Sequence, residues 1–281
     1  MTEAPVRRPA WPERYSAWLL PPRAPEGPWA RRTMEQARRG LDAAAALLYP
    51  PHCMSCGTPL PVGPNRALCL GCAERIEWIG ADRCMRCGDR VGQGRGAVDG
   101  CPSCATHPPV YVTATCTLAC YEEPLRSAIL ALKFSAGLQA VGLYGRLLAE
   151  QVRATGLDAG KRPLKGIVPV PLVEADRRRR GFNQSEELAL VLGAALGVPI
   201  RTELLKKVRS TPPQATLNAD ARRQNLRGAF VADKAACAML SDFAVLVLDD
   251  VITTGSTVSE CARTLREAGV GEVRAVALAR G

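Results

Sequence analysis

One stretch near the carboxyl end of the chain combines a buried strand, a pair of carboxylates and a helix amino terminus. Residues 243–248 form an apolar run of strand length, rich in branched side chains, as in a strand buried on both faces of a parallel sheet. Asp249 and Asp250 follow directly, then a short loop of small hydroxyl residues and glycine at residues 253–257, and then helical spacing up to a stop at Gly269. The stretch therefore predicts a strand–loop–helix unit with two carboxylates at the carboxyl end of the strand.

The loop at residues 253–257 has the composition of an anion site. Backbone N–H groups at a helix amino terminus lack partners, and the helix dipole adds positive potential at the same point. A phosphate suits that point. Asp249 and Asp250 would repel an anion if both faced it, so we expect them to accept hydrogen bonds from sugar hydroxyls or to face a metal ion. These residue types favour a ribose 5-phosphate as ligand; the alternative is an ordinary buried strand that ends in a capped turn.

Cysteine spacing gives a second constraint. The chain has 12 cysteines, and most of them form consecutive C-x-x-C pairs. Two thiolates at this spacing bind one ion from a tight turn, and two pairs complete a tetrahedral site. The separating residues 57–68 and 88–100 have the length of a zinc ribbon each, so consecutive pairing predicts two four-thiolate zinc sites. The predicted ligands are Cys53, Cys56, Cys69 and Cys72 for one zinc ion, and Cys84, Cys87, Cys101 and Cys104 for the other.

Closed four-thiolate sites have no open coordination position, so we expect both zinc ions to be structural. Because this segment has few apolar residues, metal binding is expected to supply its folding free energy, on the order of 10 kcal/mol or more per site. An interleaved pairing of the first and third cysteine pairs is an alternative that needs a cross-braced topology, and an iron–sulfur cluster is another. The remaining cysteines lie among apolar or helical residues and are expected to be buried thiols: Cys116, Cys120, Cys237 and Cys261.

Length and charge fit a protein of about two globular domains with an anionic partner. The 281 residues carry a formal net charge of +10 and a sequence pI of about 9.2, which favours phosphorylated metabolites or nucleic acid. No apolar run approaches the length of about 18 residues that a membrane span needs, and the amino terminus lacks the apolar core of a signal peptide. We therefore expect a cytoplasmic protein without a membrane span, in which reduced thiols favour metal binding over disulfides.

Composition divides the chain into three segments. Residues 1–40 are rich in proline and arginine and predict a basic, disordered tail. Residues 41–109 start with a short apolar helix at residues 41–49 and contain the cysteine pairs. Residues 110–281 alternate strand-like and helix-like segments and predict an α/β domain. Within it we expect helices at residues 125–132, 143–152 and 185–196, and a proline-punctuated strand at residues 167–172.

A run of four arginines follows that strand. Residues 174–184 contain Arg177, Arg178, Arg179 and Arg180, followed by Gly181. Arginine is a bidentate donor to phosphates, so we expect a mobile basic loop that is suited to pyrophosphate or to a nucleic-acid backbone. A solvated basic loop without a ligand is the alternative.

The order of these motifs resembles the ComF family, and the resemblance covers residues 41–281. It is carried by the cysteine pairs and then, in chain order, by Leu132-Lys133-Phe134, Val168–Leu172, Arg180–Gln184, Arg209–Gln214, Arg223-Gln224-Asn225 and Asp249–Thr257. The strand, the paired Asp and the Thr-Thr-Gly-Ser-Thr loop also resemble the phosphoribosyl-pyrophosphate motif of type I phosphoribosyltransferases. The resemblance implies a type I phosphoribosyltransferase fold, a parallel sheet flanked by helices, preceded by a double zinc ribbon.

The resemblance also implies roles for individual residues. Asp249 and Asp250 would hold the ribose hydroxyls and act as the catalytic carboxylates, and magnesium would bridge the pyrophosphate and the ribose. The residues that would wrap the 5′-phosphate are Thr253, Thr254, Gly255, Ser256 and Thr257. The candidates for the pyrophosphate are Lys133, Pro171, Arg177 and Arg180. Because residues 110–281 contain no histidine, a proton acceptor would have to be one of the two aspartates or the substrate itself.

The function that follows is a phosphoribosyltransferase with an unknown acceptor, linked to natural competence and to the uptake and processing of single-stranded DNA. Its expected partners are phosphoribosyl pyrophosphate, single-stranded DNA and proteins of DNA uptake. Two alternatives stay open: a scaffold that binds single-stranded DNA, and a regulator that senses phosphoribosyl pyrophosphate without turnover.

Overall fold

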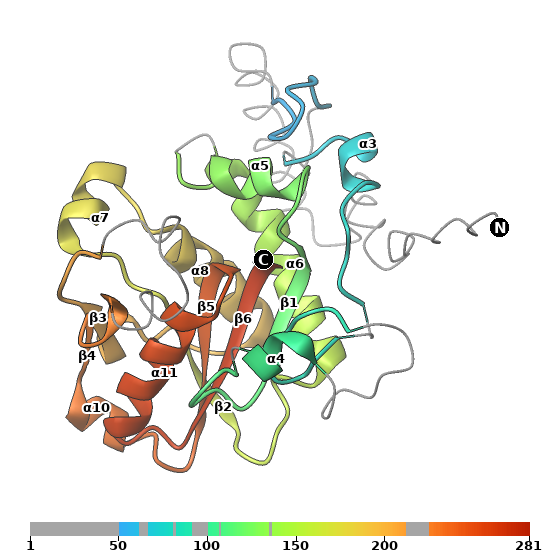
Figure 1. The fold of residues 1–281 in the computed structure, drawn as a ribbon. Helices are drawn as coiled ribbons and strands as arrows, with labels where there is room; N and C mark the ends of the chain where they lie inside the picture. Colours follow the sequence, from blue (N-terminus) through green and yellow to red (C-terminus); the bar gives the residue numbers. More distant parts are fainter. Residues whose placement is uncertain are drawn as a thin grey trace, which may run out of the picture. The chain divides into compact units, whose positions relative to one another are not determined.

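The computed structural model describes residues 51–61, 67–80, 83–91, 101–106, 108–134, 137–211 and 225–281. The predicted tail, the predicted helix at residues 41–49 and residues 212–224 lie outside the described residues. The described chain forms two compact units (Figure 1). The first unit takes the chain up to Glu77 together with Glu122–Leu143, and the second takes Trp78–Tyr121 and Tyr144–Gly281. The domain boundaries expected after residues 40 and 109 stay predictions.

The second unit is built on a parallel sheet of four strands. Their order across the sheet is β1-β6-β5-β2, and all three pairings are parallel. The central strands are almost entirely buried, as expected for a parallel sheet that is covered on both faces. The α/β fold with a parallel sheet is therefore confirmed. The strands are β1 (Thr115–Cys120), β2 (Leu164–Pro169), β5 (Ala244–Ile252) and β6 (Glu272–Arg280).

Strand β5 is longer than the apolar run predicted. It continues past Leu248 through both aspartates, because β6 offers partners along its whole length: Asp249 pairs with Ala277 and Ile252 with Arg280. The two carboxylates therefore lie within the last residues of the strand rather than after it.

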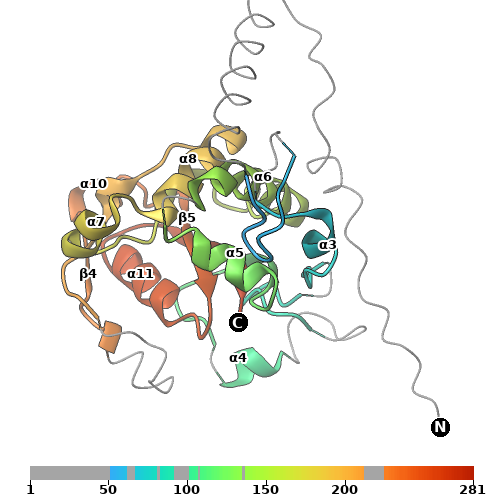
Figure 2. The same ribbon diagram turned by 90° about the horizontal axis from the view of Figure 1, so that it is seen from above.

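Helices cover both faces of this sheet. Helix α11 (Ser256–Glu267) lies on one face, whereas α8 (Gln184–Leu196) and the Tyr144–Thr155 part of α6 (Leu138–Thr155) lie on the other (Figures 1 and 2). The apolar face of α11, with Val258, Cys261 and Leu265 fully or almost fully buried, packs into a hydrophobic core cluster of the second unit. A fully buried leucine such as Leu265 contributes about 1.5–3 kcal/mol relative to an exposed one.

A small antiparallel pair stands apart from the main sheet. Strand β3 (Leu205–Lys207) follows the 3-10 turn η2 (Thr202–Leu204) and pairs with β4 (Phe230–Ala232). Helix α10 (Lys234–Ala238) comes next and begins at Asp233, whose side chain accepts a hydrogen bond from the Ala236 N–H.

The arginine run is helical, so the predicted mobile loop at residues 174–184 is wrong. Helix α7 spans Glu174–Arg180 and ends at Gly181, which has a left-handed conformation at φ +81°. Acidic residues in the first turn and arginines in the last complement the helix dipole. Ion pairs along the helix, Arg178 with Glu174 at 2.9 Å and Arg179 with Asp176 at 2.7 Å, stabilise it further.

The described part of the first unit includes the short helices α3 (Leu70–Ala73) and α5 (Leu125–Ala131) and the start of α6. The helix predicted at residues 125–132 is confirmed as α5, and Leu125, Ile129 and Leu132 form its buried face. Helix α4 (Pro102–Thr106) belongs to the second unit.

Three of the four dispersed cysteines are fully buried, as expected: Cys116, Cys237 and Cys261, while Cys120 is only partly buried. No helix among the described residues has both the length and the apolar character that crossing a bilayer requires.

Candidate functional site

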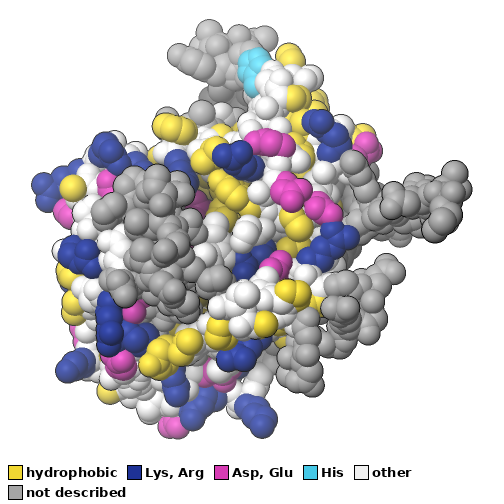
Figure 3. All heavy atoms as spheres, viewed as in Figure 1, with side chains coloured by type: hydrophobic (Ala, Val, Ile, Leu, Met, Phe, Trp, Pro, Cys, Tyr) yellow, Lys and Arg dark blue, Asp and Glu magenta, His cyan; other side chains and the backbone are white. Residues whose placement is uncertain are grey.

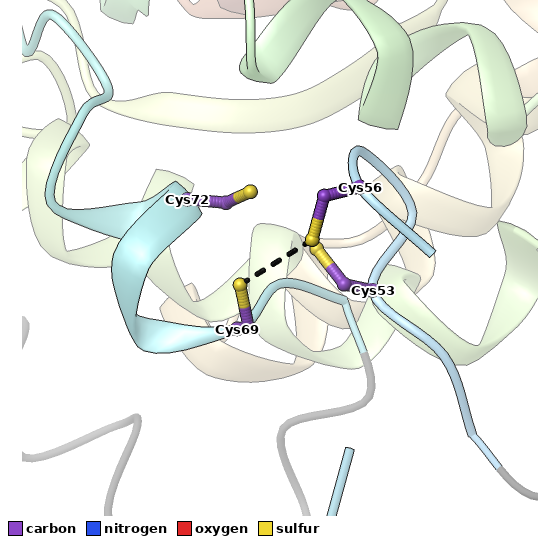
Figure 4. A group of neighbouring side chains, drawn as sticks. All are labelled: Cys53, Cys56, Cys69 and Cys72. Atoms are coloured by element: carbon purple, nitrogen blue, oxygen red, sulfur yellow. Dashed lines mark hydrogen bonds between the residues drawn. The ribbon is translucent and has the colours of Figure 1, made fainter. Parts of the chain in front are cut away.

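The eight predicted zinc ligands form two separate four-sulfur clusters. One consists of Cys53, Cys56, Cys69 and Cys72, and the other of Cys84, Cys87, Cys101 and Cys104; within each cluster the sulfur atoms lie within 4.8 Å of one another. Figure 4 shows the sulfurs of the first cluster pointing toward a common centre from a turn and from the start of α3. The consecutive pairing is therefore confirmed, and the interleaved pairing is wrong.

The sulfur distances fit zinc. Four thiolates at about 2.3 Å from one tetrahedral zinc ion lie about 3.8 Å from each other. The sulfur separations in the structure are 3.6 Å for Cys56–Cys69, 3.6 Å for Cys84–Cys104 and 3.5 Å for Cys87–Cys101. All four positions of each site are filled by cysteine, so a bound zinc ion would have no open position and would serve the structure.

The second cluster is attached to the edge of the main sheet. The Thr115 N–H donates to the Met85 carbonyl at 2.8 Å, the Thr115 hydroxyl to the Arg86 carbonyl at 2.8 Å, and the Thr117 hydroxyl to the Gly88 carbonyl at 2.7 Å. These bonds join the turn between Cys84 and Gly88 to strand β1. Residues 78 and 79 continue the contact along β1, since the Ile79 N–H donates to the Leu118 carbonyl at 2.8 Å.

The predicted phosphate loop lies where β5 passes into α11. Gly255 precedes the helix in a left-handed conformation at φ +73°, which a residue with a side chain adopts only with strain. Thr254 and Ser256 join their hydroxyls by a hydrogen bond of 2.9 Å. Thr253 is exposed and Thr254, Gly255 and Thr257 are partly exposed, so the loop and the amino-terminal turn of a 12-residue helix are open to a ligand.

The two aspartates differ in burial. Asp250 is 7% exposed, and its Oδ1 accepts from the Val251 N–H at 2.9 Å. Asp249 is partly exposed and accepts from the Asp250 N–H at 2.9 Å. The Gln184 amide at the start of α8 donates to Asp250 Oδ2 at 3.4 Å, which brings the α8 amino terminus to the carboxyl end of β5.

The turn after β2 is held at the same edge of the sheet. The Val170 N–H donates to the Leu248 carbonyl at 2.9 Å, and the Asn183 amide donates to the Val170 carbonyl at 3.0 Å. Asn183 also caps α8 by accepting from the Ser185 N–H at 3.0 Å. Since Leu248 directly precedes the paired aspartates, the turn that carries Pro171 lies beside them.

The predicted pyrophosphate residues are not equally placed. Arg180 Nη1 lies 3.3 Å from Gln184 Oε1, so Arg180 connects through Gln184 to Asp250. Arg177 forms an ion pair with Glu186 at 2.8 Å. Lys133 belongs to the first unit, whereas the paired aspartates belong to the second, so its predicted role in binding pyrophosphate stays a prediction.

Two cations of the second unit lie near the site although no sequence motif singled them out. Lys207 on β3 is partly buried, with its ammonium 5.7 Å from the centre of the Phe230 ring and 3.1 Å from the Thr211 hydroxyl. Burial lowers the pKa of Lys207, while the charges of Asp176 and Asp249 oppose that shift, so Lys207 lies within electrostatic range of the site. A lysine in an alternating strand is unremarkable in sequence, and only the fold shows its neighbours.

The second of these cations is Arg280 at the end of β6. Its side chain is 7% exposed, and Nη1 donates to the Ile252 carbonyl at 3.1 Å and to the Thr253 carbonyl, at the base of the phosphate loop. A buried arginine at the end of an apolar strand is a signal that sequence analysis could have used, because such charges need partners.

Comparison with known proteins agrees with this architecture. A family model described as a double zinc ribbon domain matches residues 44–116. Competence protein F of Haemophilus influenzae is 32% identical over 232 residues, which cover 82% of this chain and 96% of that protein. DNA utilization protein YhgH of Salmonella typhi is 32% identical over 238 residues, covering 83% of this chain and 99% of that protein, and YhgH of Escherichia coli K12 is 33% identical with the same coverage.

Two solved structures also align with the chain. One is the glutamine phosphoribosylpyrophosphate amidotransferase from B. subtilis with ADP and GMP, and the other is described as the allosteric regulatory enzyme of purine biosynthesis. Each has a TM-score of 0.34 and 20% identity, and covers 53% of this chain. The chain spans 30% of the length of each of these proteins.

The fold and the two thiolate clusters define an α/β protein with a double zinc ribbon. Its similarity to the curated relatives extends over nearly their whole length. The chain belongs to the family of competence protein F and DNA utilization protein YhgH.

Proposed function

We propose that the second unit binds phosphoribosyl pyrophosphate with magnesium at the carboxyl edge of its parallel sheet. The observation that carries the proposal is that β5 leads directly into the Thr253–Thr257 loop and the amino terminus of α11. Asp249 and Asp250 lie among the last residues of that strand. Carboxylates and a helix amino terminus within one short segment suit a ligand that has hydroxyls at one end and a phosphate at the other.

We assign one group of side chains or N–H donors to each part of the ligand. The aspartates accept hydrogen bonds from the ribose hydroxyls, and the loop N–H groups and the Thr and Ser hydroxyls donate to the 5′-phosphate. The turn at Val168–Leu172 and the Arg180 side chain lie near the aspartates and supply N–H donors and charge for the pyrophosphate. Asp249 and Asp250 are the carboxylates that would hold magnesium when it enters with the ligand, and the charge of the ion would offset that of the pyrophosphate.

As a phosphoribosyltransferase, the protein acts mainly through electrostatics. The departing pyrophosphate gains negative charge as its bond to the ribose breaks, and fixed donors at the sheet edge stabilise that charge. The described part of residues 110–281 offers Asp249 or Asp250 as proton acceptor at this edge, or the acceptor substrate gives up its proton to solvent.

The cellular role that we propose is the handling of imported single-stranded DNA. It is supported by the relatives, which are called competence protein F and DNA utilization protein YhgH, and by the net charge of +10. Structural zinc in both clusters would hold the ribbons in shape, as the sulfur distances suggest.

A scaffold that binds single-stranded DNA without a sugar-phosphate ligand is the second candidate, favoured by the same charge. Two observations weigh against a large basic surface around α7. Arg177, Arg178 and Arg179 are each paired with an acidic side chain. On the face drawn in Figure 3, Lys and Arg side chains are interspersed with Asp and Glu rather than gathered into one patch.

Calorimetric titration with phosphoribosyl pyrophosphate, with and without magnesium, tests the proposal. We expect magnesium-dependent binding that the double variant Asp249→Asn with Asp250→Asn abolishes. Asp242→Asn is the matched control, because the Asp242 side chain is 89% exposed and pairs only loosely with Arg162 at 3.7 Å. Unchanged affinity in the double variant would contradict the site, and absent binding in the natural chain would favour the scaffold.

A pyrophosphate-release assay on the same samples separates enzyme from sensor. Pooled nucleobases and single-stranded DNA serve as acceptors. Release that disappears in the double variant supports a transferase, whereas binding without release supports a regulator that senses the ligand.

A further inference from the structure

Arg280 is a buried cation that reaches from the main sheet to the base of the phosphate loop. Nη1 lies within hydrogen-bond distance of the carbonyl oxygens of Ile252, Thr253 and Gly281, at 3.1 Å for the first and 2.6 Å for the last. On the other side, Nη2 lies 3.8 Å from Asp89 Oδ2. This guanidinium is therefore placed between the peptide units that enter the loop and one carboxylate of the second ribbon.

The contact with the two carbonyls helps to set the direction of the loop N–H groups, together with the Gly281 N–H, which donates to the Ile252 carbonyl at 3.0 Å. In a planar trans peptide the C=O and the N–H of the same unit point in opposite directions. Because the Ile252 and Thr253 carbonyls point to Arg280, the N–H groups of Thr253 and Thr254 point away from it. A carbonyl that turned toward a bound phosphate would repel it, so Arg280 keeps donors rather than acceptors available to an anion.

Asp89 is held by both cysteine pairs of the second ribbon. Its carbonyl accepts from the Cys84 N–H at 2.8 Å, next to the first pair. Its carboxylate accepts from the hydroxyl of Ser103, which lies between Cys101 and Cys104. The Arg90 N–H also donates to Oδ1 of this carboxylate at 2.8 Å. The other oxygen, which faces Arg280, is held by Ser103 when the two pairs of this ribbon are brought together, as a shared zinc ion would do.

The ribbon and the loop also meet directly. Cys87 lines a small cavity together with Ile252, Thr254, Gly255 and Arg280. The Arg280 Nε is buried without a hydrogen-bond partner among the described residues, so the Asp89 carboxylate is an important counter-charge for this guanidinium.

We propose that Arg280 is a positioning residue for the phosphate loop and that the second ribbon, through Asp89, forms part of the sugar-phosphate site. Asp89 keeps Arg280 directed at the Ile252 and Thr253 carbonyls, and Arg280 keeps the loop N–H groups directed at the phosphate. The inference rests on the proposed function for its ligand, but not for the contact between the ribbon and the loop.

Four variants test the inference. Arg280→Met removes the charge, and Arg280→Lys keeps the charge but lacks the planar guanidinium with its several N–H donors. Asp89→Asn removes the counter-charge at nearly constant shape. Arg274→Met is the matched control: Arg274 is 3% exposed on the same strand, but its side chain bonds to Glu272 and to the carbonyls of Leu157 and Arg162, at the opposite end of β6. All four proteins are full-length, and elemental analysis checks that they keep their zinc.

The first readout needs no ligand. Hydrogen–deuterium exchange of the amides at residues 253–257 is expected to speed up by about tenfold in Arg280→Met and Asp89→Asn, and less in Arg280→Lys, because the loop loses its anchor. Arg274→Met is expected to lower the melting temperature and to leave exchange in this loop unchanged. Unaltered loop exchange in Asp89→Asn would overturn the inference, even if Arg280→Met fails to fold.

The second readout is affinity for phosphoribosyl pyrophosphate with magnesium. We expect the dissociation constant to rise by about tenfold or more in Arg280→Met and Asp89→Asn, with partial rescue in Arg280→Lys and none of this effect in Arg274→Met. A dissociation constant equal to that of the natural chain in Arg280→Met and Asp89→Asn would also overturn the inference. If the natural chain binds no phosphoribosyl pyrophosphate, the proposed function fails, and loop exchange alone then decides whether Arg280 positions the loop.

Discussion

The two zinc ribbons have the same cysteine spacing but differ in what surrounds them. In the first, Cys56 is exposed and Cys69 partly exposed, and the second pair is carried by the four-residue helix α3. In the second, three of the four cysteines are buried, and the turn around Cys87 bonds to strand β1. Identical metal-binding motifs can therefore have different roles: the second ribbon is an integral part of the sheet edge.

Loss of one zinc ligand should reveal the largest difference between the two ribbons. Cys87→Ser and Cys56→Ser are each expected to reduce the zinc content from two ions per chain to one. Only Cys87→Ser should destabilise the main sheet, by about 4 kcal/mol or more, because the turn that bonds to β1 loses its fold. Urea unfolding followed by hydrogen exchange of the β1 and β6 amides measures the difference. Equal losses in the two variants would show that the ribbons are equivalent.

The glycines that follow the two ribbon turns give a smaller, matched effect. Gly57 and Gly88 have similar left-handed conformations, at φ +73° and +75°. A Cβ on Gly57 would meet nothing within 4 Å, whereas one on Gly88 would lie 3.0 Å from the Thr115 methyl and 3.3 Å from the Thr117 side chain. Gly57→Ala should cost about 1–2 kcal/mol, which is the left-handed strain alone.

Gly88→Ala should cost about 1–2 kcal/mol more than Gly57→Ala, because the new methyl group also displaces β1 side chains. Chemical denaturation of both variants, each with its zinc content verified, gives the two values. A cost at Gly88 no greater than at Gly57 would contradict the close contact between the second ribbon and β1.

A single hydrogen bond between the second ribbon and the sheet can be tested by substitution at Thr117. Thr117→Val keeps the shape of a fully buried side chain but leaves the Gly88 carbonyl without the hydroxyl donor. We expect a loss of about 1–2 kcal/mol in the free energy of unfolding. Thr117→Ser, which keeps the hydroxyl, is the control and should retain the bond at the cost of one methyl group.

The smallest effect is expected at Arg75 of the first ribbon. Its guanidinium donates to the Cys72 sulfur at 3.3 Å and to the Gly71 carbonyl at 3.2 Å. The hydrogen bond to Cys72, and then the charge of that thiolate, raise the pKa of Arg75. Arg75→Ala should speed the release of zinc from the first site to a chelator by about twofold to fivefold, with release from the second site unchanged. A colorimetric chelator assay that resolves the release of the two zinc ions would show this. Faster release from the second site would contradict the prediction.

The cysteine clusters and the β5–α11 segment were predictable because their signals are local. Pair spacing determined which thiols share a metal, and the order of apolar strand, paired Asp and polar loop placed Asp250 and Gly255 at one edge of the sheet. The helix α7 was missed although its signals were present: acidic residues come first, arginines last, and Gly181 follows. The local ion pairs outweighed the flexibility that four adjacent arginines suggested.

The contacts of Arg280 and Lys207 could not be predicted, because they join residues that are distant in sequence. Arg280 meets the Ile252 carbonyl from 28 positions away, and its counter-charge Asp89 lies in another segment altogether. Such contacts depend on the register between β5 and β6, which no local pattern fixes.

The pairing of β1 also has a consequence for synthesis on the ribosome. Its partner in the sheet is β6, and Ala275, which pairs with Thr115, is synthesised roughly 160 residues later. At about 5–20 residues per second, that interval lasts on the order of 10 s, during which β1 would be an unpaired strand edge prone to aggregation. Residues 78–79 and Met85 precede β1 in the chain and bond to its other edge, so we expect these segments to cover one of the two edges of β1 early and to leave only the β6 edge open until β6 is made.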